Sequence, residues 1–347
     1  MDARFVGTQA RLAASIRYLE IARDLAPQLL STHVSEGLAT GPEPRRASKT
    51  PWFPPVSNCL STLIRVQVQG LLAVWRALPR GIRLAAYDAL RRLGARVYGA
   101  NNPTAHVQRL PFGLYLKRSG NADMVRNEFN ALQRVHDETS IPVPLPIDMM
   151  LDGDNSYLVM TRVPGVPIWR CQDVLPDADW EEIVTQLKDY LTQLRALPKT
   201  VNPAMPFCNT LGEACRDRRI SSADPVGPFP DEAAFSQWVR FSDEPSRRGH
   251  KSVFTHADLN PRNILVGRAA AQAGERSTSG GWRVTGIVDW ETAGYYPEYW
   301  DYTKALFEGF RWNRRYLDAV HRVFAEFGDY SRELDVERRS WGMGDGV

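Results

Sequence analysis

The feature that most constrains the fold of this chain is a polar cluster that lies between two short apolar runs. Residues 253–266 read VFTHADLNPRNILV, and a second apolar run over residues 284–288 ends at Asp289. Short apolar runs bounded by Asn, Asp and Pro are typical of strands that end in turns. We therefore predict that the two runs pair as a hairpin and that their polar ends lie close together.

The residue types in this cluster favour phosphoryl transfer. Asp258 is followed five positions later by Asn263, and Asp289 closes the second run. This spacing is typical of a centre in which one carboxylate orients an attacking hydroxyl and two oxygen donors hold Mg²⁺. We predict Asp258 as the catalytic base, with Asn263 and Asp289 as magnesium ligands. His256 belongs to the same catalytic loop, where its imidazole is expected to brace the loop rather than act as the base. The alternative is ordinary turn chemistry between two strands.

The segments HADLNPRNIL and GIVDWETAGYYPEYWD resemble the aminoglycoside phosphotransferase and choline kinase branch of the protein-kinase-like superfamily, in the form common among fungal phosphotransferases. The resemblance covers roughly residues 85 to 335. It implies an α+β, bilobal fold with a small β-rich amino-terminal lobe and a larger, mainly helical carboxyl-terminal lobe. It also implies ATP and Mg²⁺ as cofactors, and it implies that Asp301, which follows Pro297, buttresses the catalytic loop.

A candidate for the phosphate-binding residue lies upstream of this cluster. Residues 113–118, GLYLKR, alternate so that the two leucines share one face while Tyr115 and Lys117 share the other. Such alternation is typical of a strand. A Lys on the cleft side of a strand reaches nucleotide phosphates, whereas Arg118 points to the opposite face. We therefore predict Lys117 as the residue that binds the phosphates.

A helix is predicted over residues 122–137, where apolar side chains recur at helical spacing. Glu128 lies on an adjoining face of this helix. There it could form the ion pair that holds the phosphate-binding Lys in kinase-like enzymes. The alternative is that Glu128 is a solvated helix charge. Residues 97–107 occupy the place of a phosphate-covering loop but lack its glycine pattern, so a plain turn from helix to strand is an equal alternative.

The adenine is expected to bind at a hinge. Residues 157–165, YLVMTRVPG, combine a buried strand with a Pro-Gly turn. The resemblance implies that backbone groups of residues 160–163 bind the adenine, which makes Met160 and Val163 the candidate nucleotide contacts. The alternative is a plain edge strand.

The carboxyl-terminal part begins with a predicted core helix over residues 180–197, whose apolar positions recur at helical spacing until Pro198. Asp179 and Glu182 are predicted to cap this helix as a capping box. Residues 203–230 follow and are a candidate wall of the acceptor pocket. The alternative is a solvated loop with local ion pairs.

The sequence divides into three predicted regions. Residues 1–84 form an amino-terminal extension, which is partly helical over residues 8–30 and Pro-rich over residues 41–55. Residues 85–163 form the amino-terminal lobe and hinge, and residues 164–347 form the carboxyl-terminal lobe with the catalytic and metal-binding loops.

Composition narrows the classes of partner. The chain has 43 basic and 40 acidic residues, a net charge of +3, which is too small to favour a nucleic-acid partner. No stretch is apolar enough for integral membrane association. Four scattered cysteines without a C-x-x-C pair favour a reduced, cytoplasmic location. Arginines near the amino terminus keep a mitochondrial presequence open as an alternative, although nearby acidic residues weaken it.

The leading functional prediction is an ATP-dependent kinase that phosphorylates a hydroxyl of a small molecule resembling an aminoglycoside, choline or another metabolite. A protein kinase is less favoured because the stretch from Asp289 to Asp301 leaves little room for an activation loop. A nucleotide-binding pseudokinase or scaffold stays open because the phosphate loop is irregular. The sequence leaves the acceptor and the oligomeric state undetermined.

Overall fold

A four-stranded antiparallel sheet forms the amino-terminal part of the structure. This computed structural model describes residues 70–99, 106–152, 155–217, 224–239, 248–268, 281–307 and 309–343, all within one unit of the chain, Phe53–Val347. The predicted helix over residues 8–30, the Pro-rich segment and most of the candidate phosphate loop lie outside these residues. The strands are β1 (Val107–Leu110), β2 (Leu114–Ser119), β3 (Pro146–Asp152) and β4 (Asn155–Thr161), in the order β1-β2-β4-β3.

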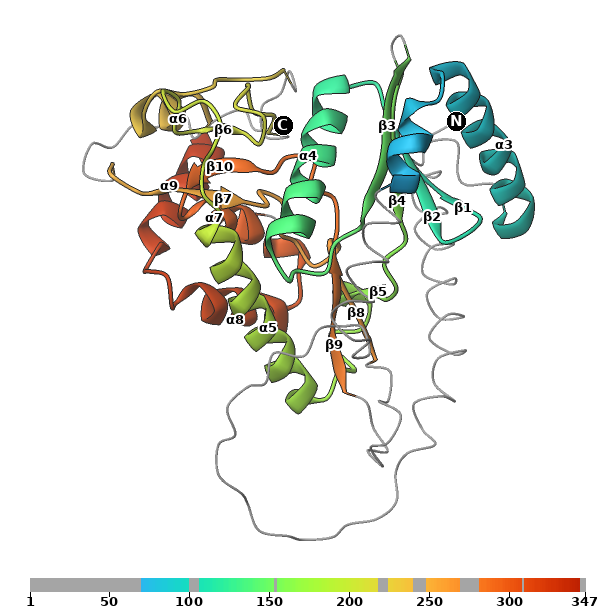
Figure 1. The fold of residues 1–347 in the computed structure, drawn as a ribbon. Coiled ribbons are helices and arrows are strands. Elements are labelled where there is room, and N and C mark those ends of the chain that lie inside the picture. Colours follow the sequence, from blue (N-terminus) through green and yellow to red (C-terminus); the bar gives the residue numbers. More distant parts are fainter. Residues whose placement is uncertain are drawn as a thin grey trace, which may run out of the picture. The chain divides into compact units, whose positions relative to one another are not determined.

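Each face of this sheet is covered by a helix (Figure 1). Helix α4 (Ala122–Glu138) buries Val125, Leu132 and Val135 together with Leu158 of β4. The next residue of β4, Val159, belongs to a separate cluster on the other face. This alternation follows from the two-residue period of a strand.

Helix α3 (Arg80–Tyr98) covers the second face. A second small core forms there from five buried side chains: Tyr87, Leu110, Leu116, Met150 and Val159. Gly94 lets α3 approach β1 closely, because a Cβ at this position would collide with the carbonyl oxygen of Arg109. The predicted boundary between residues 84 and 85 therefore falls inside a helix that packs on the sheet.

The carboxyl-terminal part is mainly helical and contains two three-stranded sheets, ordered β6-β10-β7 and β5-β8-β9. Helix α5 packs against β7 and β9. The elements in chain order are β5 (Val166–Pro167), η2 (Ile168–Arg170), α5 (Asp177–Ala196), β6 (Cys208–Asn209), α6 (Glu232–Val239), β7 (Ser252–Thr255), β8 (Ile264–Arg268), β9 (Trp282–Ile287), β10 (Gly294–Pro297), α7 (Trp300–Phe307), η4 (Gly309–Arg311), α8 (Arg314–Phe324) and α9 (Ser331–Met343).

The α+β fold class is confirmed by this arrangement of a β-rich amino-terminal part and a mainly helical carboxyl-terminal part. The predicted hairpin is also present, because β8 and β9 pair antiparallel from Ile264 opposite Ile287 onwards. Among the described helices, none has the length and hydropathy that crossing a membrane requires.

The predicted core helix is α5, but its predicted capping box is wrong. The helix begins at Asp177 after Pro176, and no side chain caps its amino terminus. Pro176 instead presents a backbone angle that already suits the start of a helix. Asp177 and Asp179 lie in the first turn, where a negative charge is favourable next to the helix dipole.

Candidate active site

The catalytic loop follows β7 and is fastened to the first turn of α7. The buried Asp301 carboxylate accepts hydrogen bonds from the backbone N–H groups of Ala257, at 2.8 Å, and His256, at 3.3 Å. Ala257 has a φ of 61°, a left-handed conformation that costs free energy for a residue with a Cβ. The two bonds from Asp301 stabilise this turn. Burial raises the pKa of Asp301, while His256 and the backbone donors oppose the shift.

His256 is fully buried, and both of its ring nitrogens have partners within the protein. Nδ1 lies 3.1 Å from the backbone N–H of Asp258, and Nε2 lies 3.1 Å from the carbonyl oxygen of Val288. The amide can only donate and the carbonyl can only accept, so the ring is the tautomer that carries its proton on Nε2. The indole of Trp290 packs on the ring at 4.4 Å between centroids. This geometry supports a bracing role for His256.

The side chain of Asp258 is oriented by two asparagines. Asn260 Nδ2 donates to Asp258 Oδ1 at 2.9 Å, and Asn263 Nδ2 donates to Asp258 Oδ2 at 3.0 Å. A carboxylate held on both oxygens keeps one orientation toward an incoming hydroxyl. Because the amide nitrogen of Asn263 faces Asp258, its Oδ1 is the atom suited to a cation. Our sequence analysis missed Asn260, although an Asn two positions after an Asp in a turn is a recognisable local pattern.

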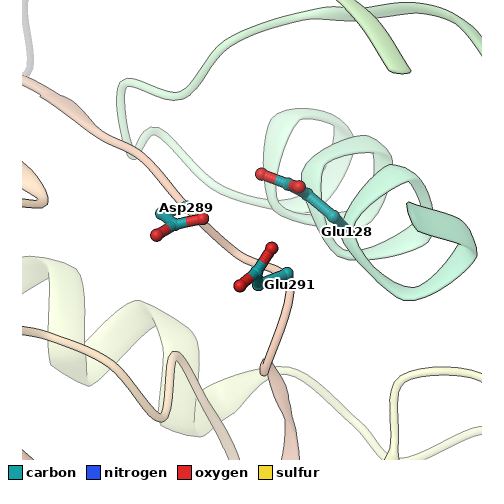
Figure 2. A group of neighbouring side chains, drawn as sticks. All are labelled: Glu128, Asp289 and Glu291. Atoms are coloured by element: carbon teal, nitrogen blue, oxygen red, sulfur yellow. The ribbon is translucent and has the colours of Figure 1, made fainter. Parts of the chain in front are cut away.

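Lys117 of β2 meets three carboxylates. Its Nζ lies 2.6 Å from Asp289 Oδ1, 2.7 Å from Glu128 Oε2 and 2.7 Å from Glu291 Oε2. Glu128 comes from α4, whereas Asp289 and Glu291 come from the segment that follows β9 (Figure 2). The structure therefore brings Lys117, Glu128 and Asp289 together as the sequence predicted. Glu291 was missed, because it lies in a turn whose shape no regular period of the sequence predicts.

We call Lys117, Glu128, Asp289 and Glu291 the Lys117 cluster. Burial and the neighbouring charges shift the pKa values of its groups in opposite directions. Burial raises the pKa of Glu128 to about 7, and the neighbouring Lys117 opposes this shift. Burial alone would lower the pKa of Lys117, but Glu128, Asp289 and Glu291 outweigh it and raise that pKa well above its usual value. The ammonium is therefore charged, and it compensates carboxylates that repel one another.

The carboxylates of the Lys117 cluster supply oxygen donors of the kind that a divalent cation prefers. One oxygen from each of Glu128, Asp289 and Glu291 lies within 4.8 Å of the other two, and oxygen donors suit Mg²⁺. Asp289 has a φ of 69°, a strained conformation that recurs at functional sites. The backbone around it is tied to the catalytic loop, because Val288 N–H donates to the carbonyl oxygen of Asn263 at 3.0 Å. Asn263, the other predicted ligand, is thus linked to the same turn.

The predicted hinge lies at the end of β4. Met160 is buried and pairs with Tyr115 on one side and Pro146 on the other. Val163 packs on Gly286 of β9, where a Cβ would collide with the Val163 side chain. The segment therefore joins the amino-terminal sheet to the hairpin, and its contact with adenine stays a prediction.

The part of residues 203–230 that the structure describes has a buried portion around two free cysteines, Cys208 and Cys215. Asp217 forms an ion pair with Lys304 of α7 at 3.3 Å, and both side chains are about nine-tenths buried. Arg216 forms another with Asp123 of α4. The region therefore contains ion pairs, but they are not local, because they join it to α7 and α4.

Two of three comparisons with known proteins give a match. The model of the phosphotransferase enzyme family (APH) matches residues 95–334. No curated protein is similar enough in sequence to count as a match.

Solved structures with a similar fold include several aminoglycoside phosphotransferases. A thermostable mutant of APH(4)-Ia is 12% identical, covers 72% of this chain and 87% of its own, and has a TM-score of 0.46. The type VIII aminoglycoside-3'-phosphotransferase is 20% identical, with coverages of 73% and 97% and a TM-score of 0.45. APH(3'')-Id from Streptomyces rimosus is 18% identical, with coverages of 75% and 99% and a TM-score of 0.45.

The match to the family model spans most of the chain and includes the catalytic loop, Lys117 and the segment after β9. This chain therefore belongs to the phosphotransferase enzyme family.

Proposed function

We propose that this protein is an ATP-dependent kinase that transfers the γ-phosphate to a hydroxyl of a small molecule. The observation that carries the proposal is the contact between Lys117 and Asp289, whose Nζ and Oδ1 atoms are 2.6 Å apart. The first residue comes from the amino-terminal sheet and the second from the end of the β8–β9 hairpin. A buried Lys that pairs with carboxylates from both parts supports a centre that the two parts form together.

Each residue has a distinct role in this proposal. Asp258, oriented by Asn260 and Asn263, accepts the proton of the acceptor hydroxyl as that oxygen attacks. Lys117 binds the nucleotide phosphates and is held by Glu128. Asn263 and Asp289 are the proposed ligands of Mg²⁺, which would neutralise charge on the phosphate oxygens. Met160 and Val163 are the proposed adenine contacts, and His256 and Asp301 hold the loop in shape.

The packing of the segment between Asp289 and Asp301 inside the fold supports a small-molecule acceptor over a protein acceptor. Residues 290–297 are all buried, and they run directly into β10 and then α7. The activation loop that a protein kinase uses to bind its substrate is an exposed segment at this position. The described residues therefore leave no such segment after Asp289.

The test is magnesium-dependent ATP consumption by the wild-type protein and Asp258→Asn across a library of hydroxyl-bearing compounds. The library would contain aminoglycosides, amino alcohols, sugars and other metabolites. We expect one acceptor class to stimulate turnover in the wild type, and we expect Asp258→Asn to reduce this turnover at least about a hundredfold because it removes the proton acceptor.

Nucleotide binding separates the proposal from a pseudokinase. ATP with Mg²⁺ should raise the melting temperature of both proteins, since Asp258 does not contact the nucleotide in this proposal. Magnesium-dependent stabilisation without turnover on any acceptor would support the pseudokinase. Turnover by Asp258→Asn at the wild-type rate would refute the assigned base.

A further inference from the structure

Asn127 of α4 lies beside Glu128 in sequence and is as well buried as the residues of the core, with 4% of its surface exposed. It belongs to neither the catalytic loop nor the Lys117 cluster. Its side-chain amide nevertheless has hydrogen-bond partners on two segments of the carboxyl-terminal part. A buried polar side chain with partners on both sides holds those segments in register.

The donor side of this amide faces the segment after Asp289. Asn127 Nδ2 donates to the carbonyl oxygen of Glu291 at 2.9 Å and to that of Ala293 at 2.8 Å. The acceptor side faces the turn that follows β6, where Asn127 Oδ1 accepts from the backbone N–H of Thr210 at 2.9 Å and from its hydroxyl at 2.6 Å. The backbone donor and the two carbonyls fix which end of the amide is nitrogen and which is oxygen.

These bonds act on the backbone that carries two carboxylates of the Lys117 cluster. The segment turns sharply after β9, with a positive φ at Asp289 and a hydrogen bond from Ala293 N–H to the carbonyl oxygen of Trp290. Asn127 ties this turn to α4, and the next residue of α4, Glu128, ties Lys117 to the same helix. One turn of α4 therefore sets the position of the Lys117 ammonium relative to Asp289 and Glu291.

We propose that Asn127 is a positioning residue for the cation site, which acts through the carbonyl groups of Glu291 and Ala293. Loss of its two donor bonds releases the turn, so the carboxylates no longer converge in the geometry that a divalent cation requires. This inference rests on the proposed function, because it concerns how that site binds its metal with the nucleotide.

The chain offers matched controls for this inference. Asn130, on the same face of α4, donates only to the carbonyl and hydroxyl oxygens of Thr210, at 3.1 Å and 3.0 Å. Asn130→Ala therefore removes contacts with the 208–213 region and leaves the contacts with Glu291 and Ala293 unchanged. Thr210→Val tests the acceptor side of Asn127 in the same way. Asn127→Asp keeps the oxygen that accepts from Thr210 and replaces the donor with a second oxygen, which the carbonyl oxygens of Glu291 and Ala293 repel; it also adds one negative charge near the site.

The experiment measures binding of Mn²⁺ to the full chain by electron paramagnetic resonance, in the presence of a non-hydrolysable ATP analogue. We expect Asn127→Ala and Asn127→Asp each to weaken Mn²⁺ binding about tenfold or more, the usual effect of losing an outer contact of a metal site. Asn130→Ala and Thr210→Val should bind Mn²⁺ within about twofold of the wild type.

Two outcomes would overturn the inference: wild-type Mn²⁺ affinity in Asn127→Ala, or an equal loss in Asn127→Ala and Asn130→Ala. If Asn127→Ala does not fold, a larger loss in Asn127→Asp than in Asn130→Ala supports the inference, and an equal loss overturns it. A wild-type protein that binds no Mn²⁺ with the analogue would instead refute the proposed function, and the inference with it. Tight wild-type binding with no effect at Asn127 would refute the inference alone.

Discussion

The two faces of the amino-terminal sheet each hold a charged cluster, and the two clusters differ in their balance of charge. On the α4 face, one ammonium group of Lys117 meets three carboxylates. On the α3 face, the single carboxylate of Asp148 meets three donors: Arg83 at 2.5 Å, and Trp75 and Tyr87 at 3.2 Å each. We call the second group the Asp148 cluster.

The difference distinguishes a binding site from a structural contact. The Asp148 carboxylate is satisfied by its own neighbours, and its donors come from the helical residues before and within α3. In the Lys117 cluster three carboxylates share one ammonium group, and Glu128 and Glu291 are buried whereas the Asp289 side chain is 30% exposed. Protonation of a carboxylate or a bound cation would lower the repulsion among them. We therefore expect substitutions in the Lys117 cluster to change activity, and those in the Asp148 cluster to change stability.

The largest effect is expected for Lys117→Met. Loss of the ammonium that we propose binds the phosphates should lower kcat at least about a hundredfold, as loss of one preorganised charged donor typically does. The protein should still fold, because protonation of Glu128 compensates part of the lost charge. Steady-state kinetics and circular dichroism would measure both quantities. The control is Arg118→Met, because Arg118 points away from the cluster to Asn155 at the surface. A variant of Lys117 with wild-type kcat would contradict this comparison.

The second effect is expected for Asp148→Ala, which should lower the free energy of unfolding by about 3 kcal/mol. Removing one partner of a buried pair leaves the Arg83 guanidinium without its counter-charge. Urea denaturation would measure this change. The value of kcat for the folded enzyme should stay close to that of the wild type. A large loss of kcat at full folding would show that the two clusters are not functionally separate.

The third effect concerns pH. The pKa of Glu128 is raised from 4.5 to about 7 in the folded protein. The native state therefore binds this proton more tightly than the unfolded state does, and the contribution of Glu128 to stability falls as pH rises between these two values. Glu128→Gln should flatten this part of the dependence of unfolding free energy on pH. Parallel slopes for the wild type and the variant between pH 5 and 7 would contradict the shift.

The smallest effect is expected at the rim of the α3 face. Arg80 and Asp152 form an ion pair there, with each side chain about half exposed. Exposed pairs contribute little, so Arg80→Ala should lower the free energy of unfolding by less than about 1 kcal/mol. The same urea denaturation would compare it with Asp148→Ala. An equal loss in the two variants would mean that burial does not set the importance of these contacts.

The sequence predicted those parts of the site whose residues follow a local pattern. Strand alternation identified Lys117, helical spacing placed Glu128 near it, and the spacing within the catalytic loop identified Asp258 and Asn263. The two short apolar runs also predicted the β8–β9 hairpin. Each of these residues lies on a strand, helix or turn whose pattern is visible in the neighbouring sequence.

Contacts between distant elements were not predictable in this way. Asn127 has nothing in its neighbourhood of the sequence to indicate partners at Thr210, Glu291 and Ala293. The packing of α3 was also missed, because Tyr87 and the strand residues it covers are far apart in sequence. The side chains involved have ordinary polarity for a helix, and only the folded arrangement makes them important.

The packing of α3 has a practical consequence for making the protein. A fragment trimmed to the family-matched region would begin at residue 95 and discard most of α3. It would lose Tyr87 and expose Leu110, Leu116, Met150 and Val159 as one continuous apolar surface. Such a fragment should aggregate during expression. A recombinant protein that begins before Gly70 keeps the surface covered and is the better starting material for crystals and assays.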